Sequence, residues 1–539
     1  MIARKSLFIV IAQFITRFLG WIGLVILAKF WGDFAPDALG VIGFAMAFIG
    51  LFSVIGDLGF NQAHIKRISE GKDLGTCIGT FAAIKIVLTV AMTIAVLTAI
   101  YIQINVLNRG FTDATTLSVI FVFLLYYILL NIQSIPTYTF NGKSEIAKMQ
   151  ITGIFENIVK VPLTILVVIA GVSLINLNSS VQWPQFLQPL QHFFAEHTLG
   201  SLAMTYVFGA VATVIVGFWF LRKYPLKKPN WELFKSYFSF ALPVILISII
   251  SVISTNIDKI MIGFFWTAKE VGYYFTVQQI TGLVGVFSSA LSVILFPTIS
   301  NYHSQKNFEN IKQTTYLANR YISMIITPVV IVTIVFVVPV INILLSEAFL
   351  PAKYVLITIL IYIFISTLMA PYGSLISGIN RPGIAAVIGA IMCIINIVLN
   401  LLFIPQWGLL SSIGINGPEG AAVATLLSGI VGIFLLMLIA KKLAGIKLLR
   451  YHTPRHIIAG LIMGFILYFI AYQTSLFLVI RWYTFLGLSF VGLGIYLAIL
   501  FIIREFKKQD LIFFLDLLQP KKMLRYVSSE LREKPKSPN

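Results

Sequence analysis

The stretch Gly142–Gly171, GKSEIAKMQITGIFENIVKVPLTILVVIAG, is apolar enough to cross a membrane, yet it carries a regular series of polar side chains. Because charges are costly inside a bilayer, helices that carry them turn them toward a bundle interior or a water-filled cavity. The stretch therefore predicts a membrane helix with a polar face that lines such a space. The side chains of this face recur every four residues and are Thr152, Glu156, Lys160 and Thr164.

The composition of the whole chain is that of a membrane protein. Of the 539 residues, 58% are hydrophobic and 11% are charged, and the mean hydropathy is +0.94. Soluble domains carry about 25% charged residues. Apolar runs of about 20 residues, the length that crosses a bilayer, occur at about fourteen positions. We therefore predict an all-α polytopic membrane protein with about fourteen transmembrane helices.

The distribution of basic residues predicts the topology. The chain has 39 Lys and Arg against 20 Asp and Glu, a formal charge of +19. In a soluble protein this excess would suggest nucleic acid, but here most basic residues fall in alternate connections and in the two tails, as the positive-inside rule requires. We expect a multi-pass cell-membrane protein with both termini in the cytoplasm, no nucleic-acid partner, and basic tails attracted to anionic membrane lipids.

Glycine spacings recur in the same order in both halves of the chain and indicate a duplication. Because each copy would hold an even number of helices, six, the copies share one orientation and are related by a pseudo-two-fold axis along the membrane normal. The matching segments are Gly40–Leu51 with Gly272–Leu283, Gly142–Gly153 with Gly378–Gly389, and Gly200–Thr205 with Gly420–Thr425. We predict lobes at 1–221 and 237–440, a cytoplasmic linker at 222–236, two further helices at 441–504 and a cytoplasmic tail at 505–539.

Charged and amide side chains inside the predicted spans are the candidates for substrate contacts. Cations at mid-span would attract an anionic substrate. Structural roles are the alternative: Lys85 can snorkel to the membrane surface, Glu156 and Lys160 can pair one helical turn apart, and Asp258 and Lys259 can lie at the interface. The full set of candidates is Gln13, Arg17, Lys85, Glu156, Lys160, Asn256, Asp258, Lys259, Asn396 and Asn400.

The sequence lacks the motifs of several enzyme and pump classes. It contains no Gly-rich phosphate loop, no paired Cys or His spacing for a metal ion, and no nucleophile elbow. Cys77 and Cys393 are expected to be small buried side chains. We therefore expect no catalytic residue, metal or cofactor. A membrane glycosyltransferase that uses outer-loop acids such as Asp33 and Asp37 is the enzyme alternative.

Two parts of the chain resemble a known transporter group. They are Gly56-Asp57-Leu58-Gly59-Phe60-Asn61-Gln62-Ala63, and Asn256-Ile257-Asp258-Lys259 with Glu270-Val271-Gly272-Tyr273-Tyr274. These segments are similar to the polysaccharide transporters of the O-antigen flippase type, within the multidrug/oligosaccharidyl-lipid/polysaccharide exporter superfamily. The group usually has a hydrophobic-Arg-Glu-hydrophobic sequence after the first segment. This chain has Ile65-Lys66-Arg67-Ile68 there and so lacks the acidic residue.

The resemblance implies a flippase that moves an undecaprenyl- or dolichyl-linked oligosaccharide from the cytoplasmic to the outer leaflet by alternating access. Arg17, Lys85 and Lys160 would then bind its phosphate or pyrophosphate, and the three asparagines its sugar hydroxyl groups. Expected partners are this substrate, membrane lipids, a coupling Na⁺ or H⁺ ion and glycan-assembly enzymes, and a monomer suffices. A lipid II flippase and a cation-coupled multidrug antiporter stay open as alternatives.

Overall fold

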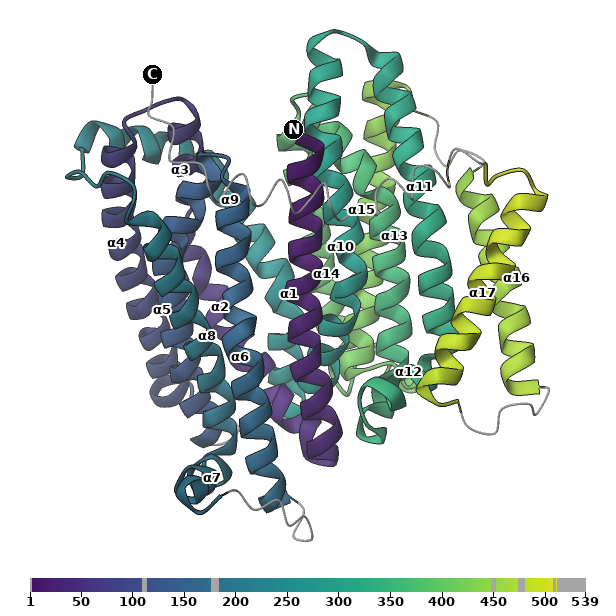
Figure 1. Cartoon of the computed structure of the whole chain (residues 1–539), viewed down its shortest axis with the longest axis horizontal. Coiled ribbons are helices and arrows are strands. Elements are labelled where there is room, and N and C mark those ends of the chain that lie inside the picture. Colours follow the sequence, from purple (N-terminus) through teal and green to yellow (C-terminus); the bar gives the residue numbers. More distant parts are fainter. Residues whose placement is uncertain are drawn as a thin grey trace. The chain divides into compact units, whose positions relative to one another are not determined.

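The computed structural model describes residues 2–108, 114–175, 184–446, 452–473, 480–507 and 510. Their regular structure is helical, without a strand in any of these ranges, which confirms the predicted all-α fold class (Figure 1). Of the predicted tail at 505–539, the part after Asp510 lies outside the described residues.

The apolar segments of the sequence form long helices. Twelve stretches of the described residues are long and apolar enough to span a membrane, so the chain is a multi-pass membrane protein. Twelve stretches do not confirm the predicted number of about fourteen spans, although one of them, Ile11–Asp57, contains two helices. The long helices are α1 (Ile2–Trp31), α2 (Ala35–Asp57), α4 (Leu74–Tyr101), α5 (Ala114–Gly142), α6 (Ile146–Ile175), α8 (Thr198–Leu221), α9 (Trp231–Phe265), α10 (Ala268–Ser304), α11 (Phe308–Val335), α13 (Lys353–Gly378), α14 (Pro382–Phe403), α15 (Gly417–Ala444), α16 (His452–Tyr468) and α17 (Trp482–Ile502). The shorter ones are α3 (Phe60–Ser69), α7 (Gln188–Glu196) and α12 (Val337–Leu344).

The helices gather into two compact units. The N-terminal unit contains Ile11–Thr276, and the C-terminal unit contains Val277–Phe403 and the described residues between Trp407 and Asp510. Helix α9 and the start of α10 therefore belong to the N-terminal unit, although the sequence repeat assigns them to the second lobe. The lobe boundary predicted at the linker 222–236 stays a prediction.

A break between α2 and α3 interrupts the segment that carries the family resemblance. Helix α2 ends at Asp57 because the next two residues, Leu58 and Gly59, adopt left-handed backbone angles with φ of 43° and 79°. The Asp57 carboxylate then accepts a hydrogen bond from the backbone N–H of Asn61 at 3.1 Å. An acidic side chain satisfies a free N–H group at the start of a helix in this way. The Asp-Leu-Gly sequence thus ends one helix and begins the next.

Helices α2 and α10 cross without room for a side chain, at two glycines that the sequence repeat pairs. A Cβ atom added to Gly40 would lie 1.7 Å from the carbonyl oxygen of Ala268, and one added to Gly272 would lie 1.9 Å from that of Pro36. Each oxygen belongs to the residue four positions before the opposite glycine. The two contacts are therefore equivalent to each other.

The linker between the predicted lobes is fastened to α4. The backbone N–H of Lys227 donates to the carbonyl of Gly75 at 3.1 Å, and the Lys227 ammonium forms an ion pair with Asp73 at 2.9 Å. Asp73 also caps α4 by accepting from Thr76. The hydrogen bonds from Lys227 and Thr76 lower the pKa of Asp73 to about 2.

In the C-terminal unit, α16 and α17 are fixed to α11 by packing and by charge. Arg320 of α11 is buried, and its guanidinium donates to Glu505 at 3.0 Å and to Asp510 at 2.7 and 2.8 Å. Burial alone would raise the pKa of both carboxyl groups, but the hydrogen bonds from Arg320 lower both values. The apolar contact between the helices is made by Met324, Val332, Phe336, Val340, Ala459, Met463, Leu467, Ala471, Leu488, Tyr496 and Leu500.

Candidate functional site

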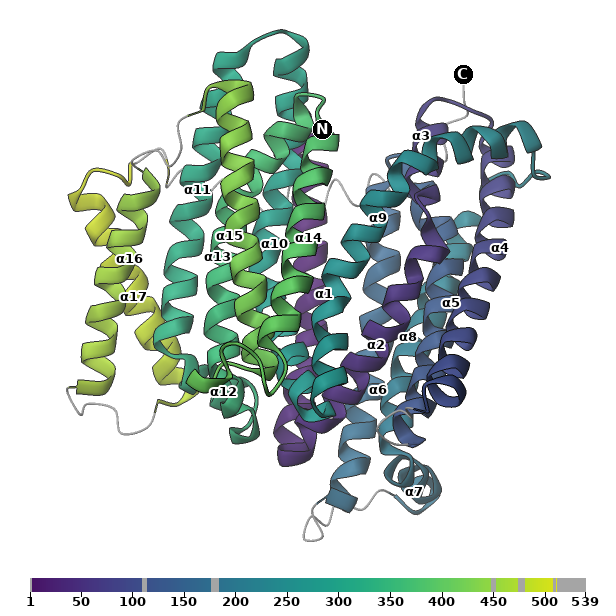
Figure 2. The ribbon, with the colours of Figure 1, turned by 180° about the vertical axis from the view of Figure 1, so that it is seen from behind.

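The polar face of α6 is directed into the N-terminal unit, toward α5 and α8. Figures 1 and 2 show these three helices side by side, with α8 between the other two. At the ends of the face, the Thr152 hydroxyl donates to the backbone carbonyl of Lys148 at 2.7 Å, and the Thr164 hydroxyl donates to the hydroxyl oxygen of Thr205 at 3.2 Å. Both threonines are buried. The two charged residues lie between them.

Glu156 and Lys160 are half-buried, and each has an aromatic partner from another helix. The hydroxyl of Tyr126, on α5, donates to the Glu156 carboxylate at 2.9 Å. The Lys160 ammonium lies 4.6 Å from the centre of the Tyr206 ring, on α8, which is a cation–π contact. Within the described residues neither charge forms an ion pair at 4.0 Å or less. The ion pair that the four-residue spacing allows is therefore not made. We call Tyr126, Glu156, Lys160 and Tyr206 the tyrosine site.

A glycine on α8 makes the tyrosine site possible. A Cβ atom on Gly209 would lie 2.9 Å from the carbonyl oxygen of Glu156 and 3.2 Å from the Cβ atom of Lys160. Any larger residue would push α8 away from α6. The rings of Tyr126 and Tyr206 are 5.9 Å apart at an interplanar angle of 86°, the edge-to-face geometry that aromatic pairs prefer.

Helix α1 brings Arg17 to the same level of the N-terminal unit. The Asn157 amide, next to Glu156, donates to the carbonyl of Thr16 at 3.1 Å, and this bond fixes α1 against α6. Arg17 is exposed and has no hydrogen bond or ion pair within the described part of the chain, whereas Gln13, one turn earlier, is half-buried. A mid-helix arginine with its charge uncompensated by the protein can accept an anionic group.

Lys85, predicted as a substrate-binding cation, is buried against the end of α2. Its side chain is only 2% exposed, and its ammonium donates to the carbonyl of Gly56 at 2.7 Å, one of the free carbonyl groups at the end of α2. A cation is favourable at the C-terminus of a helix. Lys85 therefore stabilises the break between α2 and α3, and the structure does not bring it into the tyrosine site.

Of the three candidates on α9, Asp258 and Asn256 contact neighbouring helices, and Lys259 bonds within its own helix. The buried Asp258 accepts from the Tyr274 hydroxyl at 2.6 Å, which ties α9 to α10. The buried Lys259 donates to the carbonyl of Thr255 at 2.8 Å. Asn256 lies against α2, where its side-chain oxygen is 2.9 Å from the Cβ position of Gly50. These contacts favour the structural alternative for Asp258 and Lys259.

The two candidate asparagines of the C-terminal unit bind each other. The Asn400 amide donates to the side-chain oxygen of Asn396 at 3.1 Å, and the Asn396 amide donates to the hydroxyl of Thr425 at 3.2 Å. Asn400 is fully buried and Asn396 is 7% exposed. These bonds join α14 to α15, so the recurrence of a polar stripe in the repeat corresponds to a helix contact.

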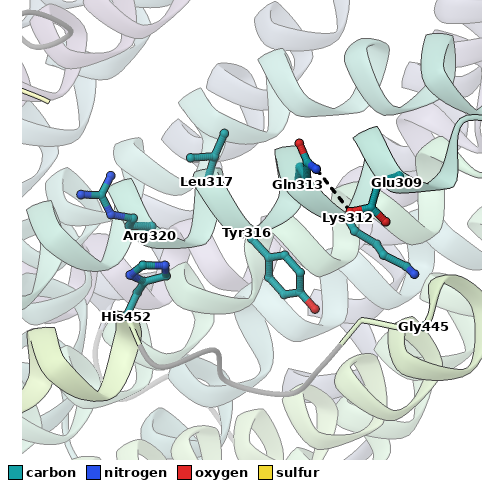
Figure 3. Close-up of a pocket in the computed structure, with 8 residues that line it drawn as sticks. All are labelled: Glu309, Lys312, Gln313, Tyr316, Leu317, Arg320, Gly445 and His452. Carbon is teal, nitrogen blue, oxygen red and sulfur yellow. Dashed lines mark hydrogen bonds between the residues drawn. The ribbon is translucent and has the colours of Figure 1, made fainter. Parts of the chain in front are cut away.

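Sequence reasoning missed a polar cavity of about 550 Å³ in the C-terminal unit (Figure 3). Arg320 and His452 lie at one end of it, and Lys312 lies at the other beside Glu309, which accepts from Gln313 at 3.3 Å. Glu505 accepts hydrogen bonds from both Arg320 and His452. The charge of Arg320 is therefore balanced by acids behind the cavity wall, and the spacing of these residues along the chain gives no signal of their contact.

Comparisons with known proteins agree on the family and the fold. The model of a family described as "Polysaccharide biosynthesis protein" matches residues 2–303. A probable low-salt glycan biosynthesis flippase of Haloferax volcanii is 24% identical over 430 residues, which cover 79% of this chain and 81% of that protein. The solved structure of the lipid II flippase MurJ in an inward closed conformation has a TM-score of 0.70 at 18% identity and covers 93% of this chain and 99% of its own. The solved structure of a multidrug resistance MATE family transporter, described as a member of the MOP superfamily and in an inward-facing conformation, has a TM-score of 0.61 at 14% identity and covers 80% of this chain and 94% of its own.

Proposed function

Because the chain belongs to the polysaccharide biosynthesis protein family, as the segment around Asp57-Leu58-Gly59 predicted, we propose that it is a flippase for a lipid-linked oligosaccharide. Its substrate is an oligosaccharide on a polyprenyl phosphate or pyrophosphate, which it moves across the cell membrane by alternating access. The family match over more than half of the chain carries this proposal, and the flippase name of the Haloferax volcanii relative supports it.

Arg17 is the residue that we assign to the phosphate or pyrophosphate of the substrate. It is the predicted cation that is exposed and has no partner in the described residues, so binding a phosphate does not require it to give up another contact. We assign Gln13, one helical turn away, to the same phosphate or pyrophosphate. We assign Lys85, Asp258, Lys259, Asn396 and Asn400 to the helix contacts that shape the substrate path, because all five are buried.

The remaining expectations belong to the same proposal. The flippase works as a monomer with both termini in the cytoplasm, uses no cofactor, and receives its substrate from glycan-assembly enzymes. Transport does not involve a chemical reaction on the chain itself. Coupling to a Na⁺ or H⁺ gradient drives it.

A lipid II flippase is the second candidate. The TM-score of 0.70 to a solved lipid II flippase, which this chain covers to 99%, supports it. Both candidates transport a polyprenyl-linked sugar, so they differ in the glycan rather than in the phosphate chemistry. A multidrug antiporter fits the contacts less well, because Glu156 has a lysine one turn away and Asp258 is bonded to Tyr274.

The test is a flipping assay in liposomes with purified protein and a fluorescent polyprenyl-pyrophosphate oligosaccharide, with lipid II in parallel. We expect wild-type protein to expose the label on the opposite leaflet and Arg17→Ala to be slower by about tenfold or more, because a hydrogen bond to a charged group contributes about 1.5–3 kcal/mol. Lys29→Ala, on the same helix, is the matched control and should flip normally. Wild-type flipping of lipid II alone would favour the second candidate, and unchanged flipping by Arg17→Ala would refute the role of this residue.

A further inference from the structure

The tyrosine site holds one negative and one positive side chain, and both come from α6. Glu156 and Lys160 are one helical turn apart on the same face, so their charges act on each other although they form no direct ion pair. Each is instead held by a ring from another helix: Tyr126 donates to Glu156 at 2.9 Å, and Tyr206 lies under the Lys160 ammonium at 4.6 Å. The charges of Glu156 and Lys160 therefore cancel, and the tyrosine site is formally neutral without a bound ion.

This neutrality depends on Lys160. A half-buried carboxylate inside a membrane bundle is costly unless a positive charge or a proton compensates it. Within the described ranges of the chain, Glu156 accepts one hydrogen bond, from Tyr126, which leaves most of the acceptor capacity of its two oxygens unused. Carboxylate and hydroxyl oxygens are also the donors that hard metal cations prefer, and an aromatic face attracts any cation. The surroundings of Glu156 therefore suit a monovalent cation, and the Lys160 ammonium already lies there.

We propose that Lys160 is a built-in cation, whose charge one helical turn away compensates the Glu156 carboxylate in place of a free monovalent cation. The tyrosine site is thereby kept from binding Na⁺, and a Na⁺ gradient does not act through this site. Removal of the ammonium alone should convert the tyrosine site into a Na⁺ site formed by Glu156 with the hydroxyl groups or ring faces of Tyr126 and Tyr206. This inference goes beyond the proposed function, because it concerns ion binding and holds whichever substrate is transported.

Lys160→Met is the variant that isolates the charge. Methionine reaches as far as the Cε atom of lysine and vacates only the position of the ammonium nitrogen, so the contact with Gly209 at the Cβ atom is kept. Lys160→Arg keeps the positive charge and is the matched control. The double variant Glu156→Gln with Lys160→Met removes both charges, and it shows whether any effect of Na⁺ requires the carboxylate.

The experiment compares thermal unfolding of purified protein in NaCl and in N-methyl-D-glucamine chloride of equal ionic strength and equal pH. We expect Na⁺ to raise the unfolding midpoint of Lys160→Met but not that of the wild type, Lys160→Arg or the double variant, because a ligand that binds only the folded state stabilises it. If Lys160→Met yields folded protein only when Na⁺ is present, the proposal is supported in its strongest form.

Three results would overturn the proposal. The first is a Na⁺-dependent rise in the wild type that Glu156→Gln removes, because the site would then take a free cation beside Lys160. The second is an unfolding midpoint of Lys160→Met that is the same in both salts. The third is a Lys160→Met protein that fails to fold in both salts, since Na⁺ would then be unable to replace the ammonium. None of these outcomes depends on the flipping assay, so failure of this inference is distinguishable from failure of the proposed function.

Discussion

The crossing of α2 and α10 gives a sharp prediction about stability, because it leaves no space for even one methyl group. In Gly40→Ala the new Cβ atom would meet the carbonyl oxygen of Ala268 at 1.7 Å, more than 1 Å inside the closest separation that real Cβ atoms show. The opposing atom belongs to the backbone, so the two helices must separate. Overpacking of this kind costs about 1–3 kcal/mol. Gly285→Ala, later on α10, meets nothing within 4 Å and should instead gain up to about 1 kcal/mol from helix propensity.

The measurement is the midpoint of thermal unfolding of each variant in detergent, followed by tryptophan fluorescence. We expect the unfolding midpoint of Gly40→Ala to lie below that of Gly285→Ala by an amount equivalent to about 1–4 kcal/mol. Gly272→Ala should behave like Gly40→Ala, since its Cβ atom would lie 1.9 Å from the carbonyl oxygen of Pro36. The double variant should cost less than the sum of the two, because the first separation of the helices also relieves the second contact. Equal midpoints for Gly40→Ala and Gly285→Ala would refute the argument.

Two further predictions concern charges outside the tyrosine site. Arg320→Ala leaves Glu505 and Asp510 buried without their guanidinium partner, so we expect a loss of about 3 kcal/mol in the free energy of unfolding, while the exposed Arg222→Ala should change it by less than about 0.5 kcal/mol. For Asp73, the pKa of about 2 lies below the value of about 3.9 in an unfolded chain, so its contribution to stability is present above pH 4 and is lost as the pH falls toward 2. Lys227→Met should reduce this loss of stability at low pH, measured as the pH dependence of the free energy of unfolding. The effect is small because both side chains of the pair are half-exposed. Identical pH profiles for the wild type and Lys227→Met would contradict the prediction.

The sequence was sufficient for properties that depend on one helix at a time. The spacing of Thr152, Glu156, Lys160 and Thr164 predicted a helix with one polar face, and α6 has that face. The Asp-Leu-Gly segment predicted the family, and the left-handed φ of 79° at its last residue is a backbone angle that favours glycine. Such features are local, because helix periodicity and turn geometry are set by residues a few positions apart.

The sequence was not sufficient for contacts between helices distant in the chain. Nothing in the spacing of residues indicates that Tyr126 and Tyr206 meet Glu156 and Lys160, since this depends on which helices become neighbours. The same holds for Arg320, which binds Glu505 although the two residues are 185 positions apart in the sequence. A glycine opposite a charged helix, such as Gly209 opposite α6, is the one signal that could have suggested a close approach.

The charged side chains of the N-terminal unit differ in whether other groups of the protein bind them. Those with partners stabilise the helix contacts, and those without remain available to a substrate. A paired or hydrogen-bonded charge inside a membrane bundle must lose its partner before it can bind anything else, and the loss of a buried partner is costly. Lys85 on the end of α2 and Lys160 in the tyrosine site are committed in this sense, one to a carbonyl oxygen and the other to a ring and a nearby carboxylate. Arg17 is exposed on a helix that is held against α6 by hydrogen bonds from Asn157 to Thr16 and from Trp31 to Val168. An anionic head group that enters the N-terminal unit can therefore be bound by Arg17 without disturbing the contacts that keep α1, α2, α5, α6 and α8 together.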